Sequence, residues 1–446
     1  MDKEAQLRKE LREIARQALA AVAPEACVEK AVHLKGGHLI VDGMTCELPR
    51  EGRLLVVGFG KASARMAAAL EGILGERIDV GLVVTADGYK VPTTRVEVVE
   101  AAHPVPDARG LAAAQRIAEL VSDAGEGDLV IVLISGGGSA LFTLPAEGIS
   151  LSDLIRVNGL LLRSGAKIQE MNVVRKHLSC VKGGQLTRLA HPARVISLIL
   201  SDVPGDPLDS IASGPTAPDP TTFQDAARIL RRYRVWEEVP EGVRARIEAG
   251  LRGEIPETPK PGDPVFARVR NVIVGSGRTA AEAALEAGTR LGFRGLILTT
   301  MLEGEAREVG KFFSALAREL VRFGRPVAPP ALLVATGETT VTVRGRGKGG
   351  RNQELALSAA LGIEGLPGVA LLSLGTDGRD GPTDAAGGLV DGGTVTRLRA
   401  AGVDPEGALA ENDSYHALEA AYDLLVTGPT GTNVADLVLL GVKEEG

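Results

Sequence analysis

The chain has 446 residues, too many for a single hydrophobic core, so its length predicts two domains, with three as the alternative. Hydrophobic residues make up 44% and charged residues 24%, as in globular proteins, and the longest apolar runs are much shorter than a membrane span. A net charge of −7 and an aromatic content of 3% argue against a nucleic-acid partner, which would select basic surfaces and stacking rings.

The first predicted element is an amphipathic helix near the amino terminus, where apolar residues recur at helical spacing and indicate a packing role. These residues are Leu7, Leu11, Ile14, Ala18, Leu19 and Val22. Acidic and basic residues occur together in this segment, which is not the pattern of a signal peptide. The three cysteines are widely spaced and suggest neither a disulfide framework nor a zinc site. We therefore expect a cytoplasmic protein without a membrane segment.

A unit then repeats along the chain: a short apolar run, a glycine turn and an alanine-rich helical segment. Residues 54–57 lead through GFGKAS into residues 64–74, residues 129–134 lead into SGGGSA, and residues 271–274 lead through GSGRT into residues 280–291. Buried strands that alternate with helices predict crossover connections and a mainly parallel sheet covered on both faces. The predicted fold class is α/β.

A proline-rich stretch at residues 253–264 is typical of a linker, because it holds four prolines and no hydrophobic periodicity. We therefore predict an amino-terminal domain over residues 1–258 and a smaller, mixed α/β carboxyl-terminal domain over residues 259–446. In the second domain we expect a strand at residues 331–335, a hairpin arm in TGETTVTV, and a helix that begins near Gln353.

The loop GFGKAS offers an anion site. Glycines at 58 and 60 let the backbone approach a ligand, a helix amino terminus follows, and Lys61 adds a positive charge. The spacing is not that of a Walker loop, and Ser63 stands where a dinucleotide fingerprint has its third glycine. Asp87 lies near the distance of a ribose-binding acid, which keeps a nicotinamide site open. A tight turn with a solvent-exposed lysine is the alternative.

The loop SGGGSA predicts a phosphate or carboxylate cradle, because three consecutive glycines are costly to order unless close backbone approach is used. The residues concerned are Ser135, Gly136, Gly137, Gly138 and Ser139. The alternative is a flexible turn. In AAHPVPD, His103 begins a turn, and a structural role is favoured over catalysis there.

Acidic residues follow the strand at residues 195–200, where open α/β sheets bind ligands. Asp202, Asp206 and Asp209 are candidates for holding Mg²⁺ together with substrate phosphates, and Asp202 is the best placed. Aspartate before proline or glycine is also ordinary turn chemistry, so some of these residues are expected to serve turns.

The glycine loops of the second domain carry a further group of polar residues. Lys348, Arg351 and Asn352 occur together in GKGGRNQE, where a guanidinium suits a carboxylate or a transferring phosphoryl group, and a solvated basic turn is the alternative. Glu338 follows a strand. Of the acids in GTDGRDGPTD, Asp377 is the preferred candidate over Asp380 and Asp384, and Asn433 lies in TGPTGTNV.

Several irregular motifs occur in an order that resembles the glycerate 2-kinase family, whose carboxyl-terminal half is called the MOFRL domain. They are GFGKAS, EAAHPVPD, LISGGGSAL, MNVVRKHLSCVKGGQL, LSDVPGD, SGPTAPDPT, ATGETTVTV, GKGGRNQELAL, GTDGRDGPTDAAG and TGPTGTNV. The resemblance covers nearly the whole chain. It implies a Rossmann-like amino-terminal domain, a smaller carboxyl-terminal domain, and an active site in the cleft between them.

The resemblance also implies an activity, namely ATP-dependent phosphorylation of D-glycerate at its 2-hydroxyl group, which gives 2-phosphoglycerate and requires Mg²⁺ or another divalent metal. By matching motif, the family's site residues fall on Lys61, Asp202, Glu338, Arg351, Asp377 and Asn433. We assign Lys61 and Arg351 to the phosphoryl group or the glycerate carboxylate. Asp202 or Asp377 would bind the metal or accept the hydroxyl proton. Gly60, the SGGGS loop and Asn352 are further expected binding residues.

Two alternatives stay open at this point, and the sequence leaves a homo-oligomer open. An NAD(P)-dependent hydroxypyruvate reductase would use the GFG turn for its dinucleotide, but the missing third glycine and the lack of a histidine–acid pair argue against it. A non-catalytic sugar-phosphate-binding protein would share the cradles without needing charged residues in both domains.

Overall fold

The structure is a computed structural model that describes residues 3–49 and 51–444. The chain forms two compact units. The N-unit comprises residues 27–201 and 206–274, and the C-unit comprises the residues up to 26, residues 202–205 and the residues from 275 onward. In the described part of the chain, no helix is both long and apolar enough to span a membrane.

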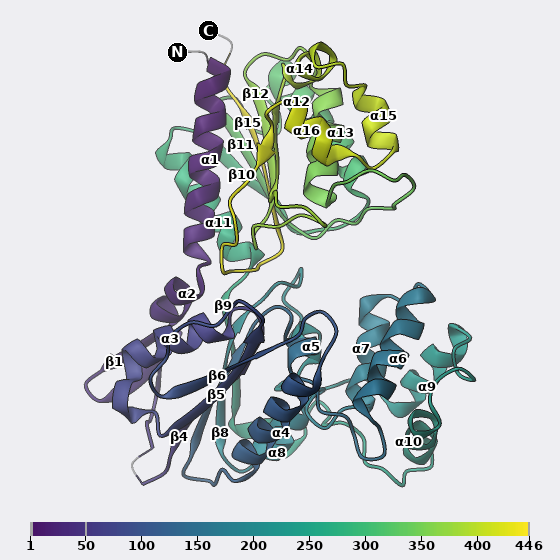
Figure 1. Ribbon diagram of the computed structural model, residues 1–446. Coiled ribbons are helices and arrows are strands. Elements are labelled where there is room, and N and C mark those ends of the chain that lie inside the picture. Colours follow the sequence, from purple (N-terminus) through teal and green to yellow (C-terminus); the bar gives the residue numbers. More distant parts are fainter. Residues whose placement is uncertain (1–2, 50, 445–446) are drawn as a thin grey trace. The chain divides into compact units, whose positions relative to one another are not determined.

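The N-unit is built on a sheet of six strands with the order β6-β5-β4-β7-β8-β9 (Figure 1). The strands are β4 (Leu54–Phe59), β5 (Val80–Ala86), β6 (Val96–Ala101), β7 (Leu129–Ile134), β8 (Arg194–Leu200) and β9 (Val269–Gly275). The pairings from β6 to β8 are parallel. Numbered along the chain, this order is 3-2-1-4-5-6, that of doubly wound α/β sheets, which reverse direction between β4 and β7.

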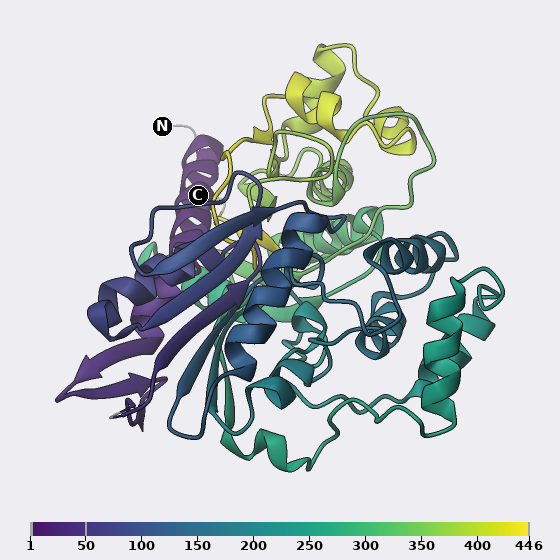
Figure 2. The ribbon, with the colours of Figure 1, turned by 60° about the horizontal axis from the view of Figure 1, so that its bottom comes forward.

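Helices cover both faces of this sheet, and β4 and β7 are buried along their whole length, which explains their continuous apolar sequences. Figure 1 shows α3 on one side and α4 with α8 on the other, and in Figure 2 α4 crosses in front of the strands. The helices of this layer are α3 (Ser63–Leu74), α4 (Ala108–Ser122), α5 (Gly138–Leu141) and α8 (Gln185–Ala190). The expected α/β class is confirmed.

Two smaller parts complete the N-unit. A helical group with its own apolar core, which includes Phe223, stands beside the sheet (Figures 1 and 2). Its helices are α6 (Leu151–Arg163), α7 (Ile168–His177), α9 (Phe223–Arg232) and α10 (Glu241–Leu251). An antiparallel sheet of three short strands is formed by β1 (Val32–Lys35), β2 (His38–Val41) and β3 (Met44–Cys46), after α2 (Pro24–Ala31). Short 3-10 turns occur at η1 (Gly75–Arg77), η2 (Ile211–Ser213) and η3 (Pro264–Arg268).

The C-unit contains a mixed sheet with the order β10-β11-β15-β12-β13-β14. Its strands are β10 (Arg294–Leu302), β11 (Ala331–Gly337), β12 (Val369–Gly375), β13 (Gly387–Asp391), β14 (Leu424–Leu425) and β15 (Asp436–Val442). β10 and β11 are parallel, whereas β15 runs antiparallel to both of its neighbours, β11 and β12. The amino end of β15 therefore lies beside the carboxyl ends of β11 and β12.

Helices pack on both faces of the mixed sheet (Figure 1). Alternate residues of one strand point to opposite cores: Leu333 of β11 faces one and Leu332 the other. The first core is closed by α12 (Ala306–Phe323), α13 (Arg351–Gly362), α14 (Thr394–Ala400), α15 (Pro405–Ala410) and α16 (Ser414–Ala420). The second is closed by α1 (Lys3–Ala21) and α11 (Gly277–Arg290).

The amino-terminal helix thus belongs to the C-unit. Leu7, Leu11 and Ile14 of α1 are completely buried against the mixed sheet, which confirms the predicted packing role. Arg8 extends the attachment, since its guanidinium pairs with Asp391 and Asp423.

The division between the units differs from the boundary expected at 258/259, because the proline-rich stretch packs inside the N-unit. Thr258 is buried and its hydroxyl donates to Asp219 at 2.9 Å, while the Asp219 N–H donates to the Pro259 carbonyl at 2.9 Å. The last passage of the chain from the N-unit to the C-unit lies between residues 274 and 275, at the carboxyl end of β9.

The hairpin arm expected in TGETTVTV is wrong. After β11 ends at Gly337, the chain forms an irregular loop up to Gly350. Side chains from elsewhere in the C-unit satisfy its backbone: Asn412 Oδ1 accepts from the N–H of Arg344 at 2.7 Å, and Glu305 accepts from that of Thr342 at 2.9 Å. In the described chain this segment makes a single parallel bridge, between Thr340 and Glu305, and is not paired with a neighbouring strand.

Candidate active site

The loop after β4 and the loop after β7 meet at the point where the N-unit sheet reverses its strand order. The Lys61 N–H donates to the Gly136 carbonyl at 2.9 Å, and the Ala62 N–H donates to Ser135 Oγ at 3.0 Å. A Cβ at Gly60 would lie 2.3 Å from Ser135 Oγ, so only glycine permits this approach. Ligands of open α/β sheets bind in the crevice at such a point.

Ser135 and the glycines that follow it have different environments. Ser135 is 1% exposed, and its hydroxyl accepts a bond that joins the two loops. Within the described residues, the N–H groups of Gly136 and Gly137 have no hydrogen-bond partner. These two groups, close to Lys61, are the donors that an anion could use.

Two residues that the sequence analysis did not select support the end of this loop. Ser139 Oγ lies 2.8 Å from Ser213 Oγ, and the buried Lys182 ammonium donates to the carbonyls of Ser139 at 2.7 Å and Phe142 at 2.8 Å. Burial lowers the pKa of Lys182 to about 7. No spacing rule links residues this far apart; only the fold brings them together.

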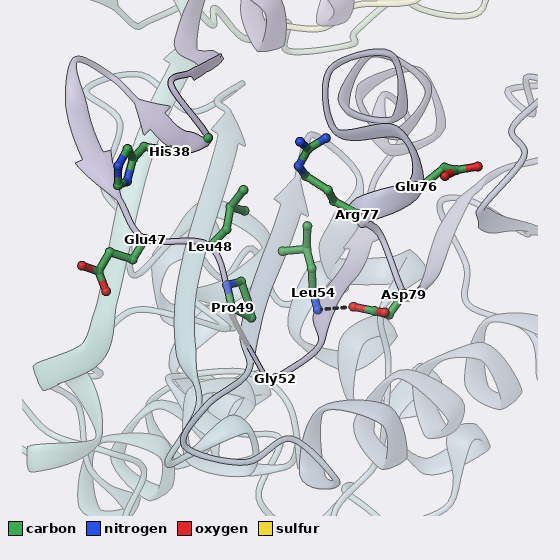
Figure 3. A pocket seen from close by; sticks show the side chains of 10 residues that line it. His38, Glu47, Leu48, Pro49, Gly52, Leu54, Glu76, Arg77 and Asp79 are labelled. Carbon is green, nitrogen blue, oxygen red and sulfur yellow. Dashed lines mark hydrogen bonds between the residues drawn. The ribbon is translucent and has the colours of Figure 1, made fainter.

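A hollow of about 480 Å³ lies at the opposite, amino-terminal edge of the same sheet, and none of the predicted site residues lines it (Figure 3). Leu54, the first residue of β4, is in its wall, and the Leu54 N–H donates to the Asp79 carboxylate at 2.7 Å. Because the amino-terminal edge of a parallel sheet is not where ligands bind in such folds, we do not place the site there.

In the C-unit, the site is organised around a buried carboxylate, Asp436, at the start of β15. Arg351 donates to it from Nε at 2.6 Å and from a terminal nitrogen at 3.0 Å, and Asn352 Nδ2 donates at 2.9 Å. The other terminal nitrogen of Arg351 pairs with Glu338 at 2.8 Å. Strand register explains the arrangement, since Asp436 is opposite both Gly337 and Gly375.

The charges of this cluster influence one another. Burial raises the pKa of Asp436 and that of Glu338, while Arg351 opposes both effects. Burial alone would lower the pKa of Arg351, but Asp436 and Glu338 outweigh it and raise the value. The side chain of Arg351 is 33% exposed, against 4% for Asp436. The guanidinium is therefore bonded to a buried carboxylate along one edge and remains partly exposed to solvent.

Two neighbours of Arg351 serve the structure of the C-unit. Asn352 is 1% exposed, and its amide carbonyl accepts from the Ser373 hydroxyl at 2.6 Å. Asp380 accepts from the N–H groups of Asn352 at 3.1 Å and Gln353 at 2.8 Å, and so caps the first turn of α13. Lys348 lies with its ammonium 4.1 Å from the ring centroid of Tyr415.

The remaining predicted acids have separate surroundings. Asp202, in the C-unit, accepts from Asn433 Nδ2 at 3.2 Å, which brings two of the predicted residues together. Asp209 is paired at 3.2 Å with the buried Lys176, and Asp377 Oδ1 accepts from the Arg379 N–H at 3.0 Å. In the cluster around Arg351, Asp436 is the residue that sequence reasoning missed. Its only signal was its position two residues after TGPTGTNV, at the start of an apolar run.

Comparison with known proteins gives matches along nearly the whole chain. Residues 10–248 match a family model described as a domain of unknown function, DUF4147, and residues 331–436 match the MOFRL family. A glycerate 2-kinase of Pyrococcus horikoshii is 49% identical over 424 residues, which cover 95% of this chain and 94% of that protein. A putative hydroxypyruvate reductase of Agrobacterium vitis is 47% identical over 399 residues, which cover 89% of each.

A solved structure agrees with these matches. The crystal structure of a glycerate kinase from Thermotoga maritima has a TM-score of 0.87 and 44% sequence identity, and covers 98% of this chain and 100% of that one.

Asp380 provides a test of the C-unit cluster. Burial raises its pKa to about 6 in the folded protein from 3.8, so the unfolded chain releases this proton first as the pH rises. The wild-type free energy of unfolding should therefore fall, relative to that of Asp380→Asn, by up to about 3 kcal/mol between pH 4 and pH 6. Urea unfolding followed by circular dichroism measures this difference.

The matched control for this measurement is Asp384→Asn, which changes an exposed aspartate in the same loop. Relative to Asp384→Asn, the wild-type free energy of unfolding should not fall between pH 4 and pH 6. A difference between wild type and Asp380→Asn that does not vary with pH would show that Asp380 ionises like an ordinary carboxylate.

Proposed function

Because the chain belongs to the glycerate 2-kinase family, we propose that it transfers the γ-phosphoryl group of ATP to the 2-hydroxyl group of D-glycerate, giving 2-phosphoglycerate and ADP. The observation that carries the proposal is that the resemblance to glycerate kinases extends through both units, in sequence and in fold. Phosphoryl transfer needs positioning and charge neutralisation more than covalent chemistry by the protein.

In this proposal the N-unit sheet is used as Rossmann-like sheets are, with an anionic group bound beside β4 and β7. Lys61 would supply a full positive charge, and the N–H groups of Gly136 and Gly137 would supply hydrogen bonds. Support comes from the position of these groups at the reversal of strand order and from the close contact of the two loops.

Arg351 would act on the phosphoryl group or on the glycerate carboxylate. Asp436 occupies one edge of the guanidinium and fixes its plane, so the side chain would meet a ligand already oriented. Glu338 shares the exposed part of the guanidinium. A bound anion would therefore compete with Glu338, whose pKa is already raised by burial.

A divalent metal fits this site as a companion of the nucleotide. Among the described residues, no group of three or more histidine, cysteine or acidic side chains is arranged to hold an ion. Mg²⁺ in kinases is usually held by one or two carboxylates together with phosphates, and Asp202 or Asp377 would provide such a carboxylate. The metal would offset the repulsion between nucleotide phosphates and the acids Glu338, Asp377 and Asp436.

The first test is identification of the product. The purified protein should form ADP and 2-phosphoglycerate from ATP and D-glycerate, and excess chelator should abolish the reaction. Phosphate position is assigned by ³¹P NMR or by coupling to enolase, which accepts only the 2-phosphate. Exclusive formation of 3-phosphoglycerate, or full activity in chelator, would contradict the proposal.

The same preparation tests the reductase alternative that the Agrobacterium vitis relative represents. The acid that would bind a ribose, Asp87, is paired through both of its oxygens with Arg109, at 2.7 and 2.9 Å. We therefore expect no oxidation of NADH or NADPH with hydroxypyruvate. Binding of both kinase substrates without turnover would favour the non-catalytic alternative.

Lys61→Met should reduce kcat by on the order of a hundredfold or more, because preorganised positive charge at a phosphoryl site contributes this much in other enzymes. The fold should persist, since Lys61 is a half-buried loop residue that does not belong to the apolar core. Lys90→Met, at an exposed position of the same unit, is the control and should leave kcat unchanged. Near wild-type turnover of Lys61→Met would remove Lys61 from the site.

Arg351→Lys should be a poor substitute although the charge is kept. One ammonium cannot reach Glu338 while making two parallel bonds to Asp436, so we expect kcat/KM to fall at least tenfold. A rise in KM for glycerate alone would assign Arg351 to the ground-state carboxylate, and a fall in kcat would assign it to the phosphoryl group. Arg399→Lys, an exposed ion-paired arginine, is the control. Wild-type kinetics for Arg351→Lys would contradict the assignment.

A further inference from the structure

Three loops of the N-unit leave the same edge of its parallel sheet, and the third of them contains His103. β4 leads to Lys61, β7 leads to Gly137, and β6 ends at Ala101, two residues before His103. Strands that run parallel end at the same edge, so the side chains that follow them become neighbours.

Gly137 is the contact point of the three loops. Its φ of +80° is left-handed, and a Cβ built there would lie 3.0 Å from His103 Nε2 and 3.4 Å from Lys61 Cγ. The imidazole and the aliphatic part of Lys61 therefore both lie against the bare face of this glycine. Any larger residue at 137 would displace the imidazole as well as strain the backbone.

The His103 ring has unused hydrogen-bonding capacity. It is exposed, and neither ring nitrogen has a hydrogen-bond partner in the described part of the chain. His177, in contrast, is buried and uses both nitrogens, with Val173 and Glu257. One part of the ring is desolvated where it packs against the neighbouring loops, and this desolvation and the Lys61 charge lower the pKa of His103 to about 4, so it is a neutral imidazole near pH 7.

We propose that His103 is a ligand-binding residue of the site that contains Lys61, where Nε2–H donates to an anionic oxygen, of a carboxylate or a phosphate, that Lys61 also holds. The inference rests on the proposed function, since Lys61 is assigned there. A neutral donor beside the ammonium adds direction to the binding of an anion without adding a second charge, which would repel Lys61.

A direct test uses the ring nitrogens themselves. The sequence has six histidines, so ¹⁵N–¹H spectra of the imidazoles are simple, and loss of one signal in His103→Gln assigns the residue. D-glycerate alone and a non-hydrolysable ATP analogue with Mg²⁺ are added in separate titrations. The proposal predicts that one of them shifts the His103 nitrogens, and the one that does identifies the oxygen as carboxylate or phosphate.

Kinetics supply the second readout. His103→Ala should raise the KM of the ligand that shifts the ring by roughly ten- to a hundredfold, as expected for a hydrogen bond to a charged group. His103→Gln, which can place an amide N–H near the position of Nε2, should recover part of this loss. A merely structural role would not give recovery by the conservative variant.

His191→Ala is the matched control, because His191 is also exposed and also precedes a proline, but lies before the amino end of β8. It should leave both KM values unchanged. If ligands bind and turnover proceeds while the His103 signals and both KM values of His103→Ala stay at wild-type values, the inference is overturned and the proposed function stands. If the wild-type protein neither binds nor phosphorylates D-glycerate and binds no nucleotide, both fail together.

Discussion

The carboxylate of Asp436 is the buried charge on which the arrangement of the C-unit site depends. A carboxylate taken from water to the edge of an apolar sheet must be paired, since removal of one partner from a buried pair typically costs about 3–5 kcal/mol. Arg351 and Asn352 supply three hydrogen bonds to it, and both come from the first turn of α13. The position of the helix and the orientation of the guanidinium are thus fixed by one acid at the start of β15.

The N-unit arranges its two central loops by contacts of a different kind. Its two central loops are joined by backbone bonds and by the hydroxyl of Ser135, and the absence of a side chain at Gly60 allows them to approach. The backbone N–H groups of Gly136 and Gly137 take no part in these bonds. One unit therefore presents backbone donors and a lysine, and the other presents an arginine fixed by acids. These are two different ways to place hydrogen-bond donors and positive charge where an anionic ligand could bind.

Much of the fold could be predicted from the sequence because buried parallel strands are continuous apolar runs, as in β4 and β7. The glycine loops and Lys61 were found for a related reason, since they occur directly after such strands. Asp436 was missed because it begins its strand instead of following one. Only the antiparallel pairing of β15 between β11 and β12 brings it to Glu338 and Arg351, and antiparallel pairing across the chain leaves no local pattern.

Two other features could not be predicted from the sequence, for physical reasons. Prolines at residues 253–264 indicate an interrupted helix and strand pattern, but not whether the irregular chain is packed, and here Thr258 and Pro259 bind Asp219. The amphipathic pattern of α1 indicates that it packs, but not against which sheet. The assignment of Lys61 and Arg351 to one bound ligand stays a prediction.

The attachment of α1 to the C-unit affects how the protein is made. This helix is synthesised before the N-unit, yet the sheet that it covers is completed only by β15 (Asp436–Val442). Its apolar stripe, with Leu7, Leu11 and Ile14, has no native partner while the whole N-unit is translated and folds. Closure of the second core therefore requires β15, so the nascent chain carries an exposed hydrophobic segment that chaperones can bind until this strand has been synthesised.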